Sequence, residues 1–467
     1  MELKTMIDTH IHSSDDTICA ISTPPGVGGI AVARISGPKA LEVVQKIWKG
    51  KPLDAMKSHS AHLGTILDSQ GNTLDQGVAT PFLAPASFTG EDVLELSVHG
   101  SRFVQRELLN ALMAAGARLA EPGEFTRRAF VNGKFDLAQA EAVADVIASD
   151  SRAAHRIAIN QMRGGYSKTL ESLREKLLEL ASLLELELDF SEEEVEFASR
   201  QHLLTLAQAI HSEVTRLQKS FAQGTAIKQG IPVAIVGATN AGKSSLLNAL
   251  LGDDRAIVSN IHGTTRDVVE DTLEIGDYQF RFMDTAGLRS TDDTIEKIGI
   301  ERSLKAISKA SIVINVADPA DPAAESIYQQ VSRTVDPEAT QLIFVTNKAD
   351  LYPRATLSFI PAEQTQISLS CATSEGLDTL RHALEEAARR IDGDSSNILV
   401  TNARHAEILA NAAQSTLRII QGLDNNLSGD LIAQDVRETI HHLGTISGTI
   451  TTTQILTTIF SRFCIGK

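Results

Sequence analysis

The stretch that decides the fold is "IPVAIVGATNAGKSSLLNALLG", residues 231–252. It begins with a short apolar run typical of a buried strand and ends with the leucine spacing of a helix. Between them, "GATNAGKS" matches the phosphate-binding pattern G-x-x-x-x-G-K-[ST]. Because the motif stands between a strand and a helix, where its mechanism requires it, the sequence predicts a P-loop nucleotide-binding domain.

Each residue type in this loop suits contact with a phosphate. Gly237 and Gly242 permit a tight turn whose N–H groups point at the anion. Lys243 is expected on the β- and γ-phosphates, and the Ser244 hydroxyl on Mg²⁺. The loop residues predicted to contact the nucleotide are Asn240, Ala241, Gly242, Lys243, Ser244 and Ser245.

Further apolar runs follow the P-loop and alternate with helical stretches. "SIVINVAD", "QLIFVTN" and "QISLS" read as short strands, which is the pattern of a doubly wound, mostly parallel sheet. "DTLEIGDYQFRFMDT" (271–285) predicts two strands around a turn at Gly276 and Asp277. This pair is expected to form an antiparallel edge of the same sheet.

The choice of base is predicted from "NKAD" (347–350), which follows the strand "LIFVT". Asp350 can accept two hydrogen bonds from guanine, whereas adenine offers neither donor and would leave the carboxylate unpaired. Asn347 is expected to brace the loop and Lys348 to cover the base. "SCA", comprising Ser370, Cys371 and Ala372, is expected to contact the guanine oxygen through its backbone. An ATPase or a decayed pseudo-GTPase explains these ordered motifs less well than a GTP-binding domain.

The hydrolytic residues are predicted around "GTTRD" and "DTAGL". Thr265 is expected to complete the Mg²⁺ shell, Asp284 to hold the ion through water, and the Gly287 N–H to contact the γ-phosphate. Leu288 follows Gly287 where many GTPases have a glutamine, and an alkyl chain cannot orient the attacking water. The predicted contacts from these segments are Ser259, Thr264, Thr265, Asp284, Thr285, Ala286 and Gly287.

Several groups could replace the missing glutamine. The first is a monovalent cation such as K⁺, held by oxygens of Asn240, Ser259, Ile261 and Thr264, which would act like an arginine finger. Arg266 is a weaker candidate for a finger, because one arginine beside a switch segment is often structural. Glu296 could orient the water, although its local pattern, among other acidic residues, favours a solvated helix carboxylate.

Composition limits the cellular role. The 467 residues exceed one ordinary core, and 43 basic against 59 acidic residues give a net charge of −16. Contact with RNA would therefore need a basic patch or a basic partner. Cys19, Cys371 and Cys464 cannot form a disulfide framework and suit a reducing cytoplasm. No apolar run is long enough for a membrane span, and no signal peptide is recognisable.

The pattern changes twice along the chain and predicts a multidomain protein. Residues 1–133 mix strands and turns in an α+β domain, 134–226 are helical, 227–391 form the nucleotide domain, and 392–467 are helical again. In the first helical part, Leu173, Leu177, Leu180, Leu184 and Leu188 recur along one face. The nucleotide domain is therefore expected to be inserted between two helical segments that pack together.

From Thr17 to Lys467 the chain resembles the MnmE (TrmE) family of tRNA modification GTPases, within the TrmE-Era-EngA-YihA-Septin-like superfamily. The resemblance rests on "TPPGVGGIAVARISG", "FTGEDVLELSVHG", "PGEFTRRAFVNGKFDLAQAEAVADVI" and the ending "FCIGK". It implies an N-terminal domain that binds tetrahydrofolate and dimerises, a discontinuous α-helical domain, and an inserted Ras-like G domain. The residues Ala238 and Thr239, where the family often has Arg-Pro, are a modest departure.

The resemblance also implies roles for single residues. It favours Glu296 as the catalytic residue that orients the nucleophile through a bridging water, and it favours K⁺ at Asn240 and the switch loop. It places 5,10-methylene- or 5-formyl-tetrahydrofolate at Arg34, Glu95, Lys134 and Lys467. Cys464 occupies a position that the family links to the modification chemistry, although a lone thiol is more often a small buried hydrophobe.

The function implied is that of a K⁺-activated, Mg²⁺-dependent, cytoplasmic GTP hydrolase that forms a homodimer. With an FAD-dependent MnmG (GidA) partner, in a heterotetramer, it would form a 5-carboxymethylaminomethyl or aminomethyl-type modification at C5 of the wobble uridine of certain tRNAs. One alternative is a ribosome-assembly or signalling GTPase switch without one-carbon chemistry; another is a one-carbon enzyme with a vestigial G domain. The N-terminal "DTHIH" (8–12) has too few partners for a metal site and is interpreted as a tail.

Overall fold

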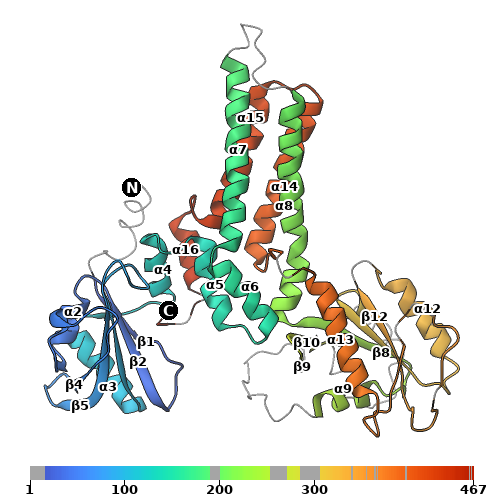
Figure 1. Cartoon of the computed structure of the whole chain (residues 1–467), viewed down its shortest axis with the longest axis horizontal. Helices are drawn as coiled ribbons and strands as arrows, with labels where there is room; N and C mark the ends of the chain where they lie inside the picture. Colours follow the sequence, from blue (N-terminus) through green and yellow to red (C-terminus); the bar gives the residue numbers. More distant parts are fainter. Residues whose placement is uncertain are drawn as a thin grey trace. The chain divides into compact units, whose positions relative to one another are not determined.

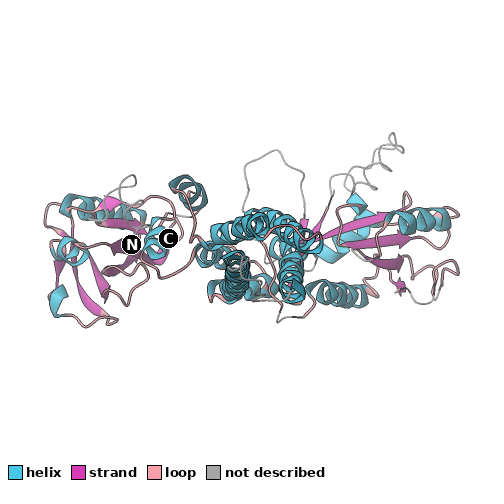
Figure 2. Ribbon diagram, turned by 90° about the horizontal axis from the view of Figure 1, so that it is seen from above, coloured by secondary structure: helices cyan, strands magenta, loops and turns pink. Residues whose placement is uncertain are grey.

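The computed structural model describes residues 16–189, 200–252, 271–283 and 306–466, apart from 338–339, 354, 362–363, 365, 395–396, 462 and 464. By their internal contacts the residues form two compact units, one of 1–147, 160–206 and 418–467, the other of 148–159 and 207–417. The strands gather in two sheets and the remaining regular structure is helical (Figure 2). In the described ranges, no helix is both long and apolar enough to cross a bilayer.

The first unit contains a seven-stranded sheet in the order β3-β4-β5-β6-β2-β1-β7. Its neighbouring strands are antiparallel, except that β7 runs parallel to β1. The strands are β1 (Ile18–Ile21), β2 (Gly28–Ser36), β3 (Trp48–Lys49), β4 (His62–Leu67), β5 (Thr73–Phe82), β6 (Val93–Gly100) and β7 (Arg118–Leu119), with α2 (Ala40–Gln45), the 3-10 helix η1 (Leu53–Ala55) and α3 (Arg102–Ala115).

Alternation along β2 and β6 separates the two faces of this sheet. Ala31, Ala33 and Ile35 of β2 are buried under α2 and α3, while Arg34 of the same strand points to the opposite face. The register pairs Arg34 with Glu95 of β6, so both side chains share that second face. The sheet therefore holds the first two predicted folate residues side by side.

Besides α2 and α3, the described helices outside the nucleotide domain are α4 (Glu124–Val131), α5 (Leu137–Ile147), α6 (Arg152–Met162), α7 (Gly165–Asp189), α8 (Arg200–Gln229), α14 (Ala403–Asp424), α15 (Gly429–Ser447) and α16 (Thr453–Phe460). All of them except α4 begin within the regions predicted to be helical, 134–226 and 392–467.

Helices that precede and follow the nucleotide domain pack against each other. Leu173, Leu177, Leu180 and Leu184 of α7 are buried, as predicted. Helix α15 lies beside α7 (Figure 1), and Arg437 of α15 forms an ion pair of 2.9 Å with Glu185 of α7. Similarly, His211 of α8 and Thr416 of α14 share a hydrogen bond of 2.8 Å. The expected packing of the two helical segments is confirmed.

The second sheet has six strands in the order β13-β12-β11-β8-β10-β9. All neighbours run parallel except the hairpin of β9 and β10, which turns at Gly276 and Asp277 and forms one edge. This confirms the predicted sheet. Its elements are β8 (Ile231–Gly237), α9 (Lys243–Gly252), β9 (Asp271–Ile275), β10 (Tyr278–Phe282), β11 (Ile312–Ala317), α12 (Ala324–Thr334), β12 (Gln341–Thr346), β13 (Gln366–Ser368) and α13 (Leu377–Asp392).

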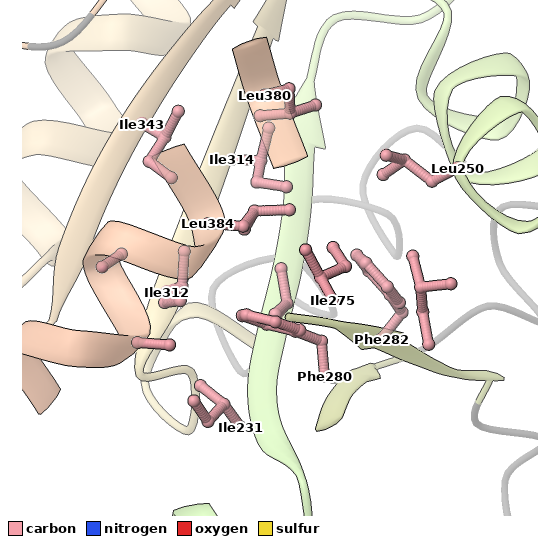
Figure 3. Packing of buried hydrophobic residues seen from close by; sticks show 14 of the residues in the cluster. Ile231, Leu250, Ile275, Phe280, Phe282, Ile312, Ile314, Ile343, Leu380 and Leu384 are labelled. Atoms are coloured by element: carbon pink, nitrogen blue, oxygen red, sulfur yellow. The ribbon is translucent and has the colours of Figure 1, made fainter. Parts of the chain in front are cut away.

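Helices cover both faces of this second sheet. On one face, Phe280 and Phe282 of β10 pack in one core with Leu250 of α9 and Leu384 of α13 (Figure 3). On the other face, Val313 of β11 packs in a smaller core with residues of α12. Because both faces are buried, the inner strands β8, β11 and β12 are almost continuously apolar, as a doubly wound sheet requires.

Candidate nucleotide-binding site

The phosphate loop joins the end of β8 to the start of α9, at the carboxyl edge of the parallel strands. Gly237 has φ +152°, and a Cβ there would lie 2.1 Å from the Val316 carbonyl oxygen of β11. Gly242 has φ +97°, and a Cβ there would lie 2.1 Å from Asn347 Nδ2. Both glycines are thus required by backbone conformation and by close neighbours. Asn240, also with positive φ (64°), is exposed within the loop.

Lys243 begins α9 and turns its side chain back over the loop. Its Nζ donates hydrogen bonds to the carbonyl oxygens of Gly237, at 3.0 Å, and Ala238, at 2.7 Å. Burial lowers the pKa of the Lys243 ammonium from its ordinary value. Positive charge is therefore held inside the turn whose N–H groups would receive a phosphate. Ser244 is half-buried and Ser245 exposed in the first turn of α9.

Asn347 ties the phosphate loop to the base-side loops. The residue is 3% exposed, and its Nδ2 donates to the Ala241 carbonyl at 2.9 Å. Its Oδ1 accepts a hydrogen bond of 3.2 Å from the Cys371 N–H. One side-chain amide thereby connects the P-loop, "NKAD" and "SCA", which are far apart in the sequence.

Ser370 orients the carboxylate that the sequence assigns to guanine. Ser370 is fully buried, and its hydroxyl donates to Asp350 Oδ1 at 2.6 Å. The same hydroxyl oxygen accepts from the N–H groups of Ala372 and Thr373, each at 3.3 Å. Asp350 itself is exposed at the carboxyl edge. Its carboxylate is therefore available to a ligand while one oxygen is held in place.

Lys348 and Cys371 complete the described base-side residues. Lys348 Nζ forms an ion pair of 2.5 Å with Asp318 Oδ2, a residue that our sequence reasoning did not select. The signal that could have found Asp318 is its position directly after a buried strand, at the ligand-binding edge of the sheet.

Burial, with help from the charge of Asp350, raises the pKa of the Cys371 thiol to about 11, although Asn347 opposes the shift. Cys371 is therefore a protonated, weakly nucleophilic thiol at neutral pH.

Many predicted site residues lie outside the described part of the chain, and their roles stay predictions. They are Ser259, Ile261, Thr264, Thr265, Arg266, Asp284, Thr285, Ala286, Gly287, Leu288, Glu296, Cys464 and Lys467, together with the N-terminal "DTHIH".

A second group of predicted residues lies in the first unit. Arg34 donates from Nε at 3.0 Å and from Nη2 at 2.8 Å to Glu95 Oε1. The Arg34 guanidinium also lies 5.4 Å from the Phe88 ring centroid and 5.8 Å from that of Phe125. The structure therefore brings an ion pair and two aromatic rings together on the face of the sheet opposite α2 and α3.

Among the other predicted folate residues, Lys134 lies near this group. Lys134 is exposed, and its Nζ donates to the Pro85 carbonyl at 3.0 Å, in the loop that leads to Phe88. Phe135 packs against Phe88 with ring centroids 5.7 Å apart. At the C-terminal end, Gly466 is buried and its carbonyl accepts a hydrogen bond of 3.0 Å from the hydroxyl of Ser22, just after β1.

A buried charged cluster supports this region and was missed by sequence reasoning. Glu124 of α4, with a side chain 2% exposed, accepts from Arg118 at 2.7 Å and from Arg128 at 3.1 Å. Burial alone would raise the pKa of Glu124, but the hydrogen bonds from Arg118 and the Glu121 N–H, with the charge of Arg128, hold it at about 2. Arg128 also pairs with Glu91 at 3.2 Å and so fixes the loop that carries Phe88.

The doubly wound sheet, the P-loop between β8 and α9, and the base-side loops after β12 and β13 define a P-loop nucleotide-binding domain of the G-domain type. Residues 17–134 match the sequence model of the "GTP-binding protein TrmE N-terminus", and residues 137–464 match that of the "MnmE helical domain".

Relatives match over their full length. The tRNA modification GTPase MnmE of Parabacteroides distasonis is 49% identical over 461 residues, which cover 97% of this chain and 100% of the relative. The protein of the same name from Bacteroides thetaiotaomicron is 47% identical over 468 residues, with 97% and 100% covered. The chain therefore belongs to the MnmE family of tRNA modification GTPases, which confirms the resemblance and the multidomain fold class.

Among solved structures, the FeoB G domain of Methanococcus jannaschii is 25% identical and covers 34% of this chain and 96% of its own. The TM-score of the two structures is 0.25.

Proposed function

We propose that this chain is a GTP hydrolase of tRNA modification, activated by K⁺ and dependent on Mg²⁺. With an FAD-dependent MnmG partner it forms a 5-carboxymethylaminomethyl or aminomethyl-type group at C5 of the wobble uridine of certain tRNAs, in the cytoplasm. The observation that carries the proposal is the pair of side-chain hydrogen bonds by which Asn347 joins the P-loop to "NKAD" and "SCA", in a chain of the MnmE family. The predicted domains, with boundaries after 133, 226 and 391, are part of the proposal.

In the nucleotide site, the chain's own residues hold GTP and select guanine. Lys243 and the loop N–H groups bind the phosphates, and Asp350, held by Ser370, accepts from the base. Ser244 fits an Mg²⁺ ligand because it occupies the first turn of α9, and exposed Asn240 offers an amide oxygen to K⁺. Bound cations supply positive charge at the phosphates during hydrolysis.

The first unit has groups that fit a folate. Glu95 is a carboxylate able to pair with the donor edge of a pterin, and Arg34 can pair with a carboxylate of the tail. The half-buried Phe88 supplies apolar ring surface beside them, and the fully buried Phe125 lies against the Arg34 guanidinium. We propose that Arg34, Glu95, Lys134 and Lys467 bind a 5,10-methylene- or 5-formyl-tetrahydrofolate that provides the carbon.

Exposed apolar side chains of the first unit support the proposed homodimer. Val27 is 77% exposed, Ile30 at the start of β2 is 68%, and Phe103 at the start of α3 is 59%. The register pairs Gly28 at the start of β2 with Gly100 at the end of β6. Val27 and Ile30 therefore lie near the segment that leads from β6 to Phe103. Such grouped apolar exposure is typical of a surface that another chain covers.

The test of the catalytic proposal is the GTPase rate in K⁺ and in Na⁺, for the natural chain and for Glu296→Ala. We expect much faster hydrolysis in K⁺, and a variant that binds GTP but no longer hydrolyses it. Glu301→Ala is the matched control, because it removes a nearby carboxylate of the same segment and should keep the rate. Equal rates in both salts contradict the cation assignment, and an active Glu296→Ala contradicts the water-orienting role.

A ribosome-assembly switch is the alternative, and folate binding separates the two functions. We expect 5-formyl-tetrahydrofolate to bind the natural chain and to bind Glu95→Gln much more weakly, as measured by calorimetry. His62→Ala, on the same sheet but outside the proposed site, is the control. A natural chain that ignores the folate would favour the switch.

A further inference from the structure

The ion pair between Lys348 and Asp318 lies at the carboxyl edge of the second sheet. Asp318 directly follows β11, and Lys348 comes two residues after the end of β12. These strands are paired in parallel up to Ala317 and Thr346, so the two loops leave the sheet side by side. The carboxyl edge is where open α/β sheets bind their ligands.

Each oxygen of the Asp318 carboxylate has a separate partner. Oδ1 accepts a hydrogen bond of 3.0 Å from the Ala320 N–H, in the turn that Asp318 begins. Oδ2 receives Lys348 Nζ at 2.5 Å, and the Asp318 side chain is only 14% exposed. The backbone bond therefore fixes the carboxylate, and the fixed carboxylate offers its second oxygen to the lysine.

The backbone of Lys348 is also held in a defined conformation. Its φ of +63° lies in the left-handed region, which is uncommon for a lysine. Its carbonyl accepts from the N–H groups of Leu351, at 2.9 Å, and Tyr352, at 3.0 Å. With the backbone and the ammonium both fixed, the alkyl stem between them has little freedom, although the side chain is 35% exposed.

We propose that Asp318 is a positioning residue for guanine nucleotides, which acts through Lys348. By holding the Lys348 ammonium, it keeps the alkyl stem in place against the base that Asp350 recognises. The inference rests on the proposed binding of GTP.

The other two polar side chains of "NKAD", Asn347 and Asp350, are also held by neighbouring groups. Asn347 is anchored on Ala241 and Cys371, and Asp350 is anchored on Ser370, so Asp318 is the anchor of the third. A pre-ordered side chain loses less conformational entropy when a ligand binds. Asp318 should therefore lengthen the residence of the nucleotide without changing which base is chosen.

The experiment measures dissociation of a fluorescent GDP analogue from the full chain, chased with excess GDP. Asp318→Asn keeps an oxygen for the Ala320 N–H but loses the charge, and we expect dissociation about three- to tenfold faster. Lys348→Met keeps a similar stem without the ammonium and should also dissociate faster. The double variant should release the nucleotide no faster than Lys348→Met alone, because the effect of Asp318→Asn passes through the lysine.

Asp321→Asn is the matched control. Asp321 begins a similar turn, in which its Oδ1 accepts from the Ala323 N–H at 2.9 Å, and its substitution should leave dissociation within twofold of the natural rate. The ratio of GDP to inosine diphosphate affinity should be the same in Asp318→Asn as in the natural chain.

Three results would overturn the inference. The first is that Asp318→Asn leaves the dissociation rate unchanged. The second is that it accelerates dissociation as much in the Lys348→Met variant as in the natural chain. The third is that it changes the base preference. A natural chain that does not bind GDP at all would instead overturn the proposed function, and this inference with it.

Discussion

Tyr278 donates a hydrogen bond of 2.9 Å from its hydroxyl to the carboxylate of Asp392, which is 3% exposed. Arg156 Nη2 reaches both oxygens of that carboxylate, at 2.7 and 2.5 Å. Asp392 is the last residue of α13, where the helix dipole disfavours an anion, so these partners are needed. Because Arg156 belongs to α6 and Tyr278 to β10, the carboxylate joins a helix to the edge hairpin of the nucleotide-binding sheet.

Removing the partners of Asp392 should destabilise the second unit. Arg156→Ala leaves a buried carboxylate without its cation, and we expect the free energy of opening to fall by about 2–3 kcal/mol. Tyr278→Phe removes one hydrogen bond and should cost about 1 kcal/mol. Hydrogen exchange of the β8 and β10 amides measures both, since it reports local stability.

Arg152 of the same helix provides the control. It pairs with Asp277 at 3.2 Å, but the two side chains are 82% and 50% exposed, so Arg152→Ala should change the opening free energy by about 0.5 kcal/mol or less. An equal effect of the two arginine variants would show that burial of Asp392 does not determine the energy.

Gly242→Ala should abolish tight nucleotide binding. The added methyl group would lie 2.1 Å from Asn347 Nδ2 and would have to occupy a φ of +97°, so the loop and the amide that supports it must both move. We expect at least a tenfold loss of GTP affinity in titrations. Gly252→Ala, at the other end of α9, meets nothing within 4 Å and should bind normally. Normal binding by Gly242→Ala would contradict the role of the loop.

Asp350→Asn should change the preferred base. The amide can no longer accept both guanine hydrogen bonds but can donate to the extra carbonyl of xanthine, so GTP affinity should fall by about a hundredfold or more while xanthosine triphosphate gains. Ser370→Ala keeps the carboxylate and loses only its anchor, and about a tenfold weaker GTP affinity is expected. Competition binding with the two nucleotides distinguishes these cases. Unchanged GTP affinity in Asp350→Asn would refute the assignment.

The buried carboxylate of Glu124 should make the first unit sensitive to acid. Its pKa is depressed to about 2 from an ordinary 4.5, so its stabilisation is fully present above pH 4.5 and is lost as the pH falls through 2. Glu124→Gln should therefore be less stable than the natural chain at pH 7, by up to about 3 kcal/mol, with the gap closing towards pH 2.

Urea unfolding followed by Trp48 fluorescence measures this effect, because Trp48 is buried in the core of the first unit. Glu171→Gln is the control, since Glu171 is 54% exposed in its pair with Arg174. A stability gap between the natural chain and Glu124→Gln that stays constant with pH would contradict the depressed pKa.

Local chemistry made much of the fold predictable. The β9–β10 hairpin follows from two strand-like segments of alternating apolar and polar residues around Gly276, and the buried face of α7 follows from its leucine spacing. The P-loop follows from two glycines, a lysine and a serine between a strand and a helix. These features depend on residues a few positions apart, so they can be predicted from the order of residues along the chain.

Contacts between distant residues required the tertiary structure. Asn347 and Ala241 are 106 positions apart, Arg34 and Glu95 are 61, and Arg156 and Asp392 are 236. The pairing of Lys348 with Asp318 and the cluster around Glu124 likewise came from the structure. The sequence by itself therefore determined which loops carry the chemistry, through local spacing and turn residues. Only the tertiary structure decided which side chains support one another, because strand order and register, not distance along the chain, set those neighbours.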